Sequence, residues 1–246
     1  MSGLRNMNSL RFFRTLHAGF AATLSAHTNG DPVVGALLAG AFGHFDAAVD
    51  VQCQGMPALA CAKGCATCCT IRVTATAPEV LWVARHLREA CEPAQCRRLV
   101  RRLLEADALT RDLDEPERVA LRQRCPFIEQ GACVIYAVRP LACRGHASYD
   151  RKACVLAATG RIAEVPYSMP HQTARSLVQN AMQSALRDAG LAWASYELNH
   201  ALRIALADQD AATKWARGGD VFADAVIAEI SAAEMAQGFD QIKQLT

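Results

Sequence analysis

The sequence has little excess charge of either sign and no long hydrophobic run. It carries 26 Lys and Arg against 24 Asp and Glu, a net charge of +2. This balance gives no reason to expect binding to nucleic acid or to an anionic membrane surface. No apolar run reaches the roughly 18–20 residues of a transmembrane helix, so no membrane span is expected. A Gly-rich phosphate loop and a Ser/His/Asp arrangement, which would signal nucleotide binding or serine hydrolysis, are also lacking.

Composition favours a folded chain of one domain. Hydrophobic residues make up 52% and charged residues 20% of the 246 residues, which excludes general disorder. No internal repeat, low-complexity linker or change of composition marks a boundary. We therefore predict a single domain over 1–246, with a cysteine-bearing core at about 53–160 and helical segments on both sides.

Apolar residues recur with helical spacing at both ends of the chain. The residues before Asp31 include arginines and no acid, and they loosely resemble a targeting peptide. The helical spacing of Phe13, Leu16, Phe20 and Leu24, with no clean cleavage site after them, favours an amphipathic first helix instead.

Further helices are predicted near 34–45, from Thr76 to about 91, around 96–103, over 174–190, near 198–206, and from Val221 past Ile230. Thr76, Pro78 and Glu79 have the order of a helix start with a capping box. Short strands are expected near 71–75 and 161–165. The predicted fold is mainly α, with helices packed around an irregular, loop-rich cysteine cluster and few short strands.

Eleven cysteines are the outlying feature of the composition. A disulfide scaffold is disfavoured because the chain is long, the count is odd and two cysteines are adjacent. Reduced thiols gathered around a metal, in a cytoplasmic protein, fit the pattern better.

Eight of these cysteines form two groups in the sequence. The upstream group is the run CAKGCATCC, and the downstream group begins with CPFIEQGAC. Thiolate is the soft ligand that zinc and iron–sulfur clusters favour, and Gly64 allows the chain to turn between the first two thiols. The predicted metal ligands are Cys61, Cys65, Cys68, Cys69, Cys125, Cys133, Cys143 and Cys154.

The three remaining cysteines are interpreted as core residues. Cys91 and Cys96 continue apolar helix stripes and Cys53 is isolated, which is ordinary for a buried cysteine. His146 follows Cys143 at a spacing that permits a shared metal, but an ordinary loop histidine is the interpretation we favour.

Neighbouring Cys68 and Cys69 point in different directions, so they either serve different metals or only one of them is a ligand. The spacings of the downstream group are poor for a self-contained zinc site. We expect the upstream and downstream groups to share one metal region, and the alternative is two independent sites, one per group. Arg139 and Arg144 are expected beside the centre, where their charge offsets excess thiolate charge.

These residues resemble the YkgJ-like cysteine-cluster proteins, which are described as zinc- or iron-chelating. The family pattern is a cysteine run ending in Cys-Cys, then Cys-Pro-Phe-Leu, Cys-x-Ile-Tyr-x-x-Arg-Pro and Cys-Arg. The matching positions are Cys61, Cys65, Cys68, Cys69, Cys125, Pro126, Phe127, Cys133, Ile135, Tyr136, Arg139, Pro140, Cys143 and Arg144. Ile128 departs from the usual Leu, and the first two cysteines are separated by three residues where two are also common.

The resemblance implies a bound metal ion, zinc or iron, and a 4Fe–4S cluster is one form that the iron could take. The family also includes a flagellin lysine-N-methylase, so methyl transfer is an activity by analogy. The spacing Cys61-x3-Cys65-x2-Cys68 also occurs in radical S-adenosylmethionine enzymes, but the alternating βα units of those enzymes are not indicated here. Three functions stay open: a metal-binding protein without catalysis, an iron–sulfur-dependent enzyme of methyl transfer or redox chemistry, and a zinc-folded adaptor for protein interaction.

Overall fold

The structure, a computed structural model, describes residues 2–27, 30–161 and 164–245. It is 64% helical, and the described residues form eleven α-helices and only short strands, which confirms the predicted mainly α class. The helices are α1 (Ser2–Ala26), α2 (Gly30–Gln52), α3 (Ala77–Ala90), α4 (Pro93–Thr110), α5 (Glu115–Leu121), α6 (Leu141–Gly145), α7 (Arg151–Ala158), α8 (Met169–Asp188), α9 (Leu198–Ala207), α10 (Ala211–Ala216) and α11 (Ala232–Gln244).

Two small antiparallel sheets complete the fold. β1 (Thr74–Ala75) pairs with β4 (Tyr196–Glu197), and β2 (Ile128–Glu129) pairs with β3 (Ala132–Cys133) in a hairpin. Two 3-10 turns follow at η1 (Tyr136–Val138) and η2 (Ala223–Ala225). The described residues contain no parallel sheet, so the βα units of a radical S-adenosylmethionine enzyme are absent from this part of the chain.

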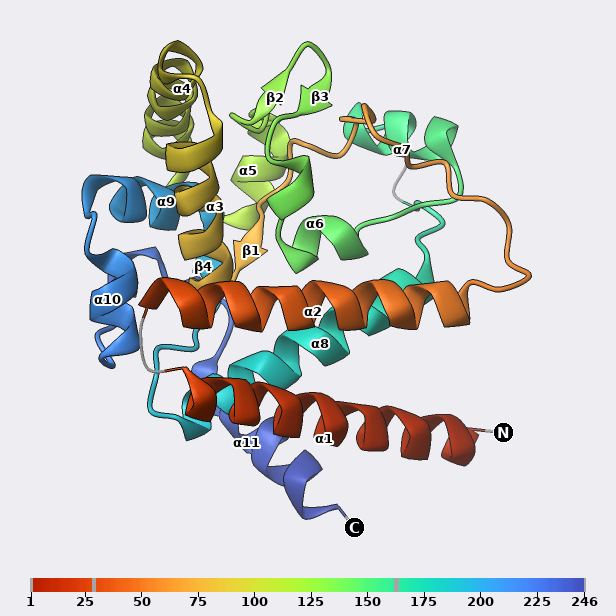
Figure 1. The fold of residues 1–246 in the computed structure, drawn as a ribbon. Helices are drawn as coiled ribbons and strands as arrows, with labels where there is room; N and C mark the ends of the chain where they lie inside the picture. The colour runs from red at the N-terminus through yellow and green to blue at the C-terminus, as the bar shows by residue number, and fades with distance from the viewer. Residues whose placement is uncertain (1, 28–29, 162–163, 246) are drawn as a thin grey trace.

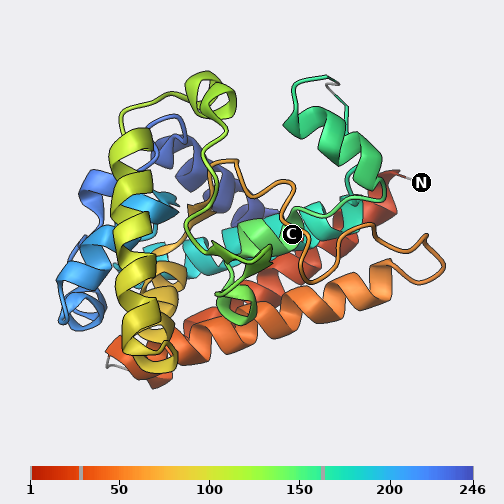
Figure 2. The same ribbon diagram turned by 90° about the horizontal axis from the view of Figure 1, so that it is seen from above.

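The long helices form a platform beneath the cysteine-bearing middle of the chain. α8 packs against both α1 and α2, and α2 also packs against α3 (Figure 1). The middle of the chain, from the loop after α2 to α7, lies on one side of this platform (Figures 1 and 2). Among these elements, α6 is anchored to α8.

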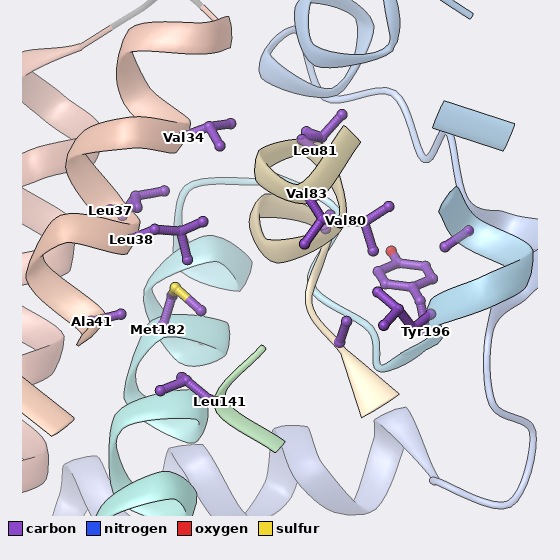
Figure 3. Close-up of a cluster of buried hydrophobic side chains, with 14 of the residues drawn as sticks. Val34, Leu37, Leu38, Ala41, Val80, Leu81, Val83, Leu141, Met182 and Tyr196 are labelled. Atoms are coloured by element: carbon purple, nitrogen blue, oxygen red, sulfur yellow. The ribbon is translucent and has the colours of Figure 1, made fainter. Parts of the chain in front are cut away.

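The hydrophobic core lies where α2, α3 and α8 meet. Leu37 and Leu38 of α2, Val83 of α3 and Met182 of α8 are fully buried and turn toward one another (Figure 3). Burying a side chain of this size contributes about 1.5–3 kcal/mol, so these contacts hold the platform together.

α2 is long and apolar enough to cross a membrane when judged by length and composition alone. No membrane-spanning helix was predicted from the sequence. Its residues Val33, Val34, Leu37, Leu38 and Ala41 are buried against the rest of the protein. Core helices of soluble proteins and signal sequences pass the same test, and α2 packs on the core through one face, with 33% of its apolar stretch buried.

Glu79 joins the start of α3 to the start of α6. Its carboxylate accepts hydrogen bonds from the Thr76 N–H at 2.7 Å and the Thr76 hydroxyl at 2.8 Å, which confirms the predicted capping box. It also accepts a bond from the Leu141 N–H at 2.6 Å. Burial raises the pKa of Glu79, and these hydrogen bonds, together with Arg175, lower it in part. Glu79 therefore both caps the start of α3 and makes a long-range contact to α6, which carries Cys143.

Three predicted elements were wrong, shorter than expected or only partly within the described residues. The helix predicted from Val221 past Ile230 is absent there, because Val226 forms a β-bridge with Tyr196 and the Ile227 N–H donates to Ser195. Ser231 then caps α11, which starts only at Ala232. The strand expected at 71–75 is limited to β1. The one expected at 161–165 includes residues 162–163, which lie outside the described residues, and the described residues beside them are not in a strand.

Candidate metal centre

The upstream and downstream cysteine groups lie side by side. The Cys125 N–H donates to the Cys69 carbonyl at 2.8 Å, and the Ala60 N–H donates to the Ser148 carbonyl at 2.9 Å. The loop after α2 is thus held at two points by the segments that carry Cys125, Cys143 and Cys154. The two groups occupy one region of the molecule, as expected, and do not lie on opposite faces.

Tight turns set the positions of the upstream thiols. The Cys65 N–H donates to the Ala62 carbonyl at 2.9 Å, and the Cys69 N–H donates to the Ala66 carbonyl at 3.2 Å. Gly64 has φ +95°, a conformation that an L side chain rarely adopts. Glycine between Cys61 and Cys65 therefore permits the turn that the spacing requires.

Cys61 lies among Cys65, Cys68 and Cys154. Burial raises the pKa of the Cys61 thiol, a hydrogen bond from the Ser148 N–H lowers it, and the charges of these three thiolates raise it further. The Ser148 N–H lies 3.3 Å from the Cys61 Sγ. Cys154 on α7, a member of the downstream group, therefore lies near thiols of the upstream group.

Cys143 lies among the other thiols of the downstream group. Burial raises the pKa of the Cys143 thiol well above its ordinary value, and the charges of Cys125 and Cys133 raise it further. Burial likewise raises the pKa of Cys125 to about 11. Cys133 is on β3, whose hairpin brings it close to Cys125, and Cys143 is on α6. The backbone bond between Cys125 and Cys69 brings Cys69 to this set.

Cys68 and Cys69 connect the two sets. A hydrogen bond with Cys69 and then burial raise the pKa of the Cys68 thiol to about 12, whereas a hydrogen bond with His146 lowers it. Cys68 is also in electrostatic reach of Cys61 on one side and Cys143 on the other. Cys68 therefore links the thiols around Cys61 to those around Cys143.

The donor set fits a thiolate-bound metal in its chemistry, because soft thiolate ligands suit zinc and iron. In the described ranges, no three His, Cys, Asp or Glu side chains converge closely enough to form a ready-made metal site. None of the eleven cysteines is in a disulfide, so the thiols are free to act as ligands. Rotation of thiol side chains on a fixed backbone is a small adjustment compared with the free energy that zinc–thiolate bonding supplies.

The two predicted arginines have different surroundings. Arg139 lies close enough to Cys133 and Cys143 that its charge lowers the pKa of both thiols in part, and its guanidinium stacks 4.0 Å from the Tyr136 ring centre. Arg144 instead donates to the carbonyls of Ala137 at 2.7 Å and Arg139 at 3.1 Å. Arg139 thus supplies charge near the thiols, and Arg144 holds the backbone turn between them.

His146 belongs to the site more closely than its sequence context indicated. It is hydrogen-bonded to the Cys68 thiol, and its ring lies 4.8 Å from that of Tyr167. The only sequence signal was its distance from Cys143, yet its contact is with Cys68, which lies far away in sequence. Tyr167 and Arg122, which also border this region, carried no sequence signal at all.

The other three cysteines lie apart from this gathering. The Cys53 Sγ is 3.9 Å from the His171 Nδ1. Cys91 ends α3 and faces Cys96 of α4 and Glu129, and these groups together with burial raise its pKa. The structure thus separates these thiols from the eight predicted ligands.

Replacing Cys53, Cys91 or Cys96 with alanine is expected to leave the metal content unchanged, because none of them borders the eight-thiol region. Inductively coupled plasma mass spectrometry of each purified variant checks this. Loss of metal from any one of the three would show that the division between ligands and other cysteines is wrong.

Comparison with known proteins supports a metal centre here. Residues 60–160 match the family model CxxCxxCC, described as "Putative zinc- or iron-chelating domain". The match covers the cysteine-bearing middle of the chain, less than half of its length, and it supports metal binding by this segment. No curated protein and no solved structure matches the chain.

Proposed function

We propose that the chain binds metal at two adjacent thiolate centres, each built from both cysteine groups. The ligands of the first centre are Cys61, Cys65, Cys68 and Cys154. The ligands of the second centre are Cys69, Cys125, Cys133 and Cys143. This differs from one shared site and from one site per group, the two arrangements considered from the sequence.

The observation that carries the proposal is the way in which the eight thiols separate. The thiols that act on Cys61 are Cys65, Cys68 and Cys154, whereas those that act most strongly on Cys143 are Cys125 and Cys133, followed by Cys68. Four thiolates complete the tetrahedral shell of a structural zinc ion. Cys68 acts on Cys61, and the Cys69 carbonyl accepts a hydrogen bond from the Cys125 N–H, so we assign Cys68 to the first set of four and Cys69 to the second.

The charge of the site supports metal binding over free thiolates. Burial and mutual repulsion raise the thiol pKa values of Cys61, Cys125 and Cys143, so without metal these groups hold their protons at neutral pH. A divalent cation reverses this balance by stabilising the thiolate form. Because thiolates must stay reduced to bind metal, we place the protein in a reducing compartment, the cytoplasm.

Metal analysis together with an absorption spectrum tests the proposal. Anaerobically purified protein is expected to contain two zinc ions per chain and to be colourless, or to contain iron in the same eight-thiol region. A brown protein that absorbs near 400 nm would favour an iron–sulfur centre and, with it, the enzyme alternative. Protein that retains neither metal after expression with added zinc or iron would contradict the proposal.

A further inference from the structure

A cavity of about 160 Å³ adjoins one half of the thiol region. The Cys68 and Cys154 thiols and the His146 ring are part of its wall, and Tyr167 closes another side. Two further wall residues, Ile71 and Val119, are 41% and 54% exposed, so the cavity reaches the protein surface. Its volume would hold on the order of five water molecules. Thiols of the first centre are therefore accessible to small molecules.

Arg122 lines this cavity as the residue that ends α5. Its φ of +53° is the left-handed conformation in which helices commonly end, and its N–H donates to the Arg118 carbonyl. A Cβ atom added at Gly160 would lie only 2.7 Å from the Arg122 Nη2, so glycine there makes room for the guanidinium. No carboxylate in the described part of the chain forms an ion pair with Arg122. Its positive charge is thus free to attract an anion to the cavity.

The second centre has a different environment. Cys125 borders a cavity of about 30 Å³, which is smaller than the one beside the first centre. Cys143 is on α6, which packs on α8, whereas Cys154 is on α7, which among the described elements packs on no other helix or strand to a comparable extent. Figure 2 shows α7 standing apart from the helical platform. The first centre thus has an access route and a ligand on a peripheral helix, whereas the second centre has a ligand, Cys143, on a helix anchored to α8.

We propose that the first centre is an exchangeable metal site, and that a small anionic chelating molecule or side chain reaches its metal through the cavity past Arg122. The second centre retains its metal and holds the fold. This inference rests on the two centres proposed above.

The exchange is a ligand substitution without electron transfer. Incoming donor atoms would replace Cys68 and Cys154, the two proposed ligands that line the cavity, before Cys61 and Cys65. The metal would leave as the dication, and the released thiolates would take up protons from the buffer. Arg122 favours anionic over neutral donors by electrostatic attraction.

Competition kinetics on the zinc-loaded full chain test the inference. With excess nitrilotriacetate, an anionic chelator, one equivalent of zinc is expected to leave at least tenfold faster than the other. Isotope-coded alkylation at the end of the fast phase should label Cys61, Cys65, Cys68 and Cys154 but not Cys125, Cys133 and Cys143. Release of both equivalents at one rate, or labelling of the second set first, would overturn the inference. Failure to bind two zinc ions at the outset would instead contradict the proposed centres.

The role of Arg122 is tested with Arg122→Ala and a second chelator. This variant should slow the fast phase several-fold with nitrilotriacetate and leave it unchanged with neutral 1,10-phenanthroline. Arg151→Ala, which removes an exposed arginine of α7 that does not border the cavity, is the matched control and should behave like the unmodified protein. Equal rates for Arg122→Ala and the unmodified protein with nitrilotriacetate would show that the cavity is not the route.

Discussion

Glu79→Ala is expected to destabilise the protein by about 3 kcal/mol or more. The substitution leaves the N–H groups of Thr76 and Leu141 without their acceptor in a fully buried position. Each buried unsatisfied donor costs about 1–3 kcal/mol, and the loss of a buried carboxylate next to Arg175 adds to this. Equilibrium urea unfolding of the metal-loaded protein measures the change.

The matched control is Glu89→Ala on the same helix. Glu89 is exposed and, among the described residues, pairs only with Arg85, so its removal should change the free energy of unfolding by less than about 0.5 kcal/mol. Glu79→Ala should also lower the metal content, since the start of α6 holds Cys143 in place. A Glu79→Ala variant as stable as the control would show that this carboxylate does not tie α3 to α6.

Removing the metal is expected to loosen the upstream and downstream segments together. Each proposed centre joins the loop at 61–69 to elements between Cys125 and Cys154, so loss of metal removes both sets of links. Zinc–thiolate sites contribute on the order of 10 kcal/mol to the folding of zinc-finger peptides, which makes this the largest single change predicted. Hydrogen–deuterium exchange before and after treatment with a chelator follows both segments.

Helix α1 serves as the internal reference for that experiment. It packs on α8 and α2 and contributes Phe13, Leu16 and Phe20 to the apolar core, so its amides should keep their protection. If amides of 61–69 lost protection while those of 125–145 kept it, each group would bind its own metal and the mixed arrangement would be wrong.

Local patterns were sufficient to predict most of the helices. The order Thr76, Pro78 and Glu79 predicted the start of α3 because a capping box depends only on residues of the first turn. Helical spacing predicted α8, and Gly190 beyond its end has φ +70°. The error near Val221 has a non-local cause, since Val226 pairs with Tyr196, a residue whose position depends on the tertiary fold.

The candidate ligands, like most helices, could be predicted from local sequence, whereas their arrangement depends on long-range contacts. Clustered cysteines identified the eight thiols because metal-binding cysteines gather in the sequence. Their separation into two sets depends on contacts between distant segments, such as that of Cys69 with Cys125, which spacing does not encode. Long-range contacts also bring His146 to Cys68 and place Arg122 at the cavity, so neither role could be predicted from the chain alone.

The measurement that tests the two-centre proposal most directly is the metal content of Cys68→Ser and Cys69→Ser, compared with the unmodified protein. Each variant is expected to retain one of two metal ions, since each removes a ligand from a different centre. Alkylation mapping should then find Cys61, Cys65 and Cys154 unprotected in Cys68→Ser, and Cys125, Cys133 and Cys143 unprotected in Cys69→Ser. Exposure of the same set of thiols in both variants, or full metal content in either, would contradict two centres divided between adjacent cysteines.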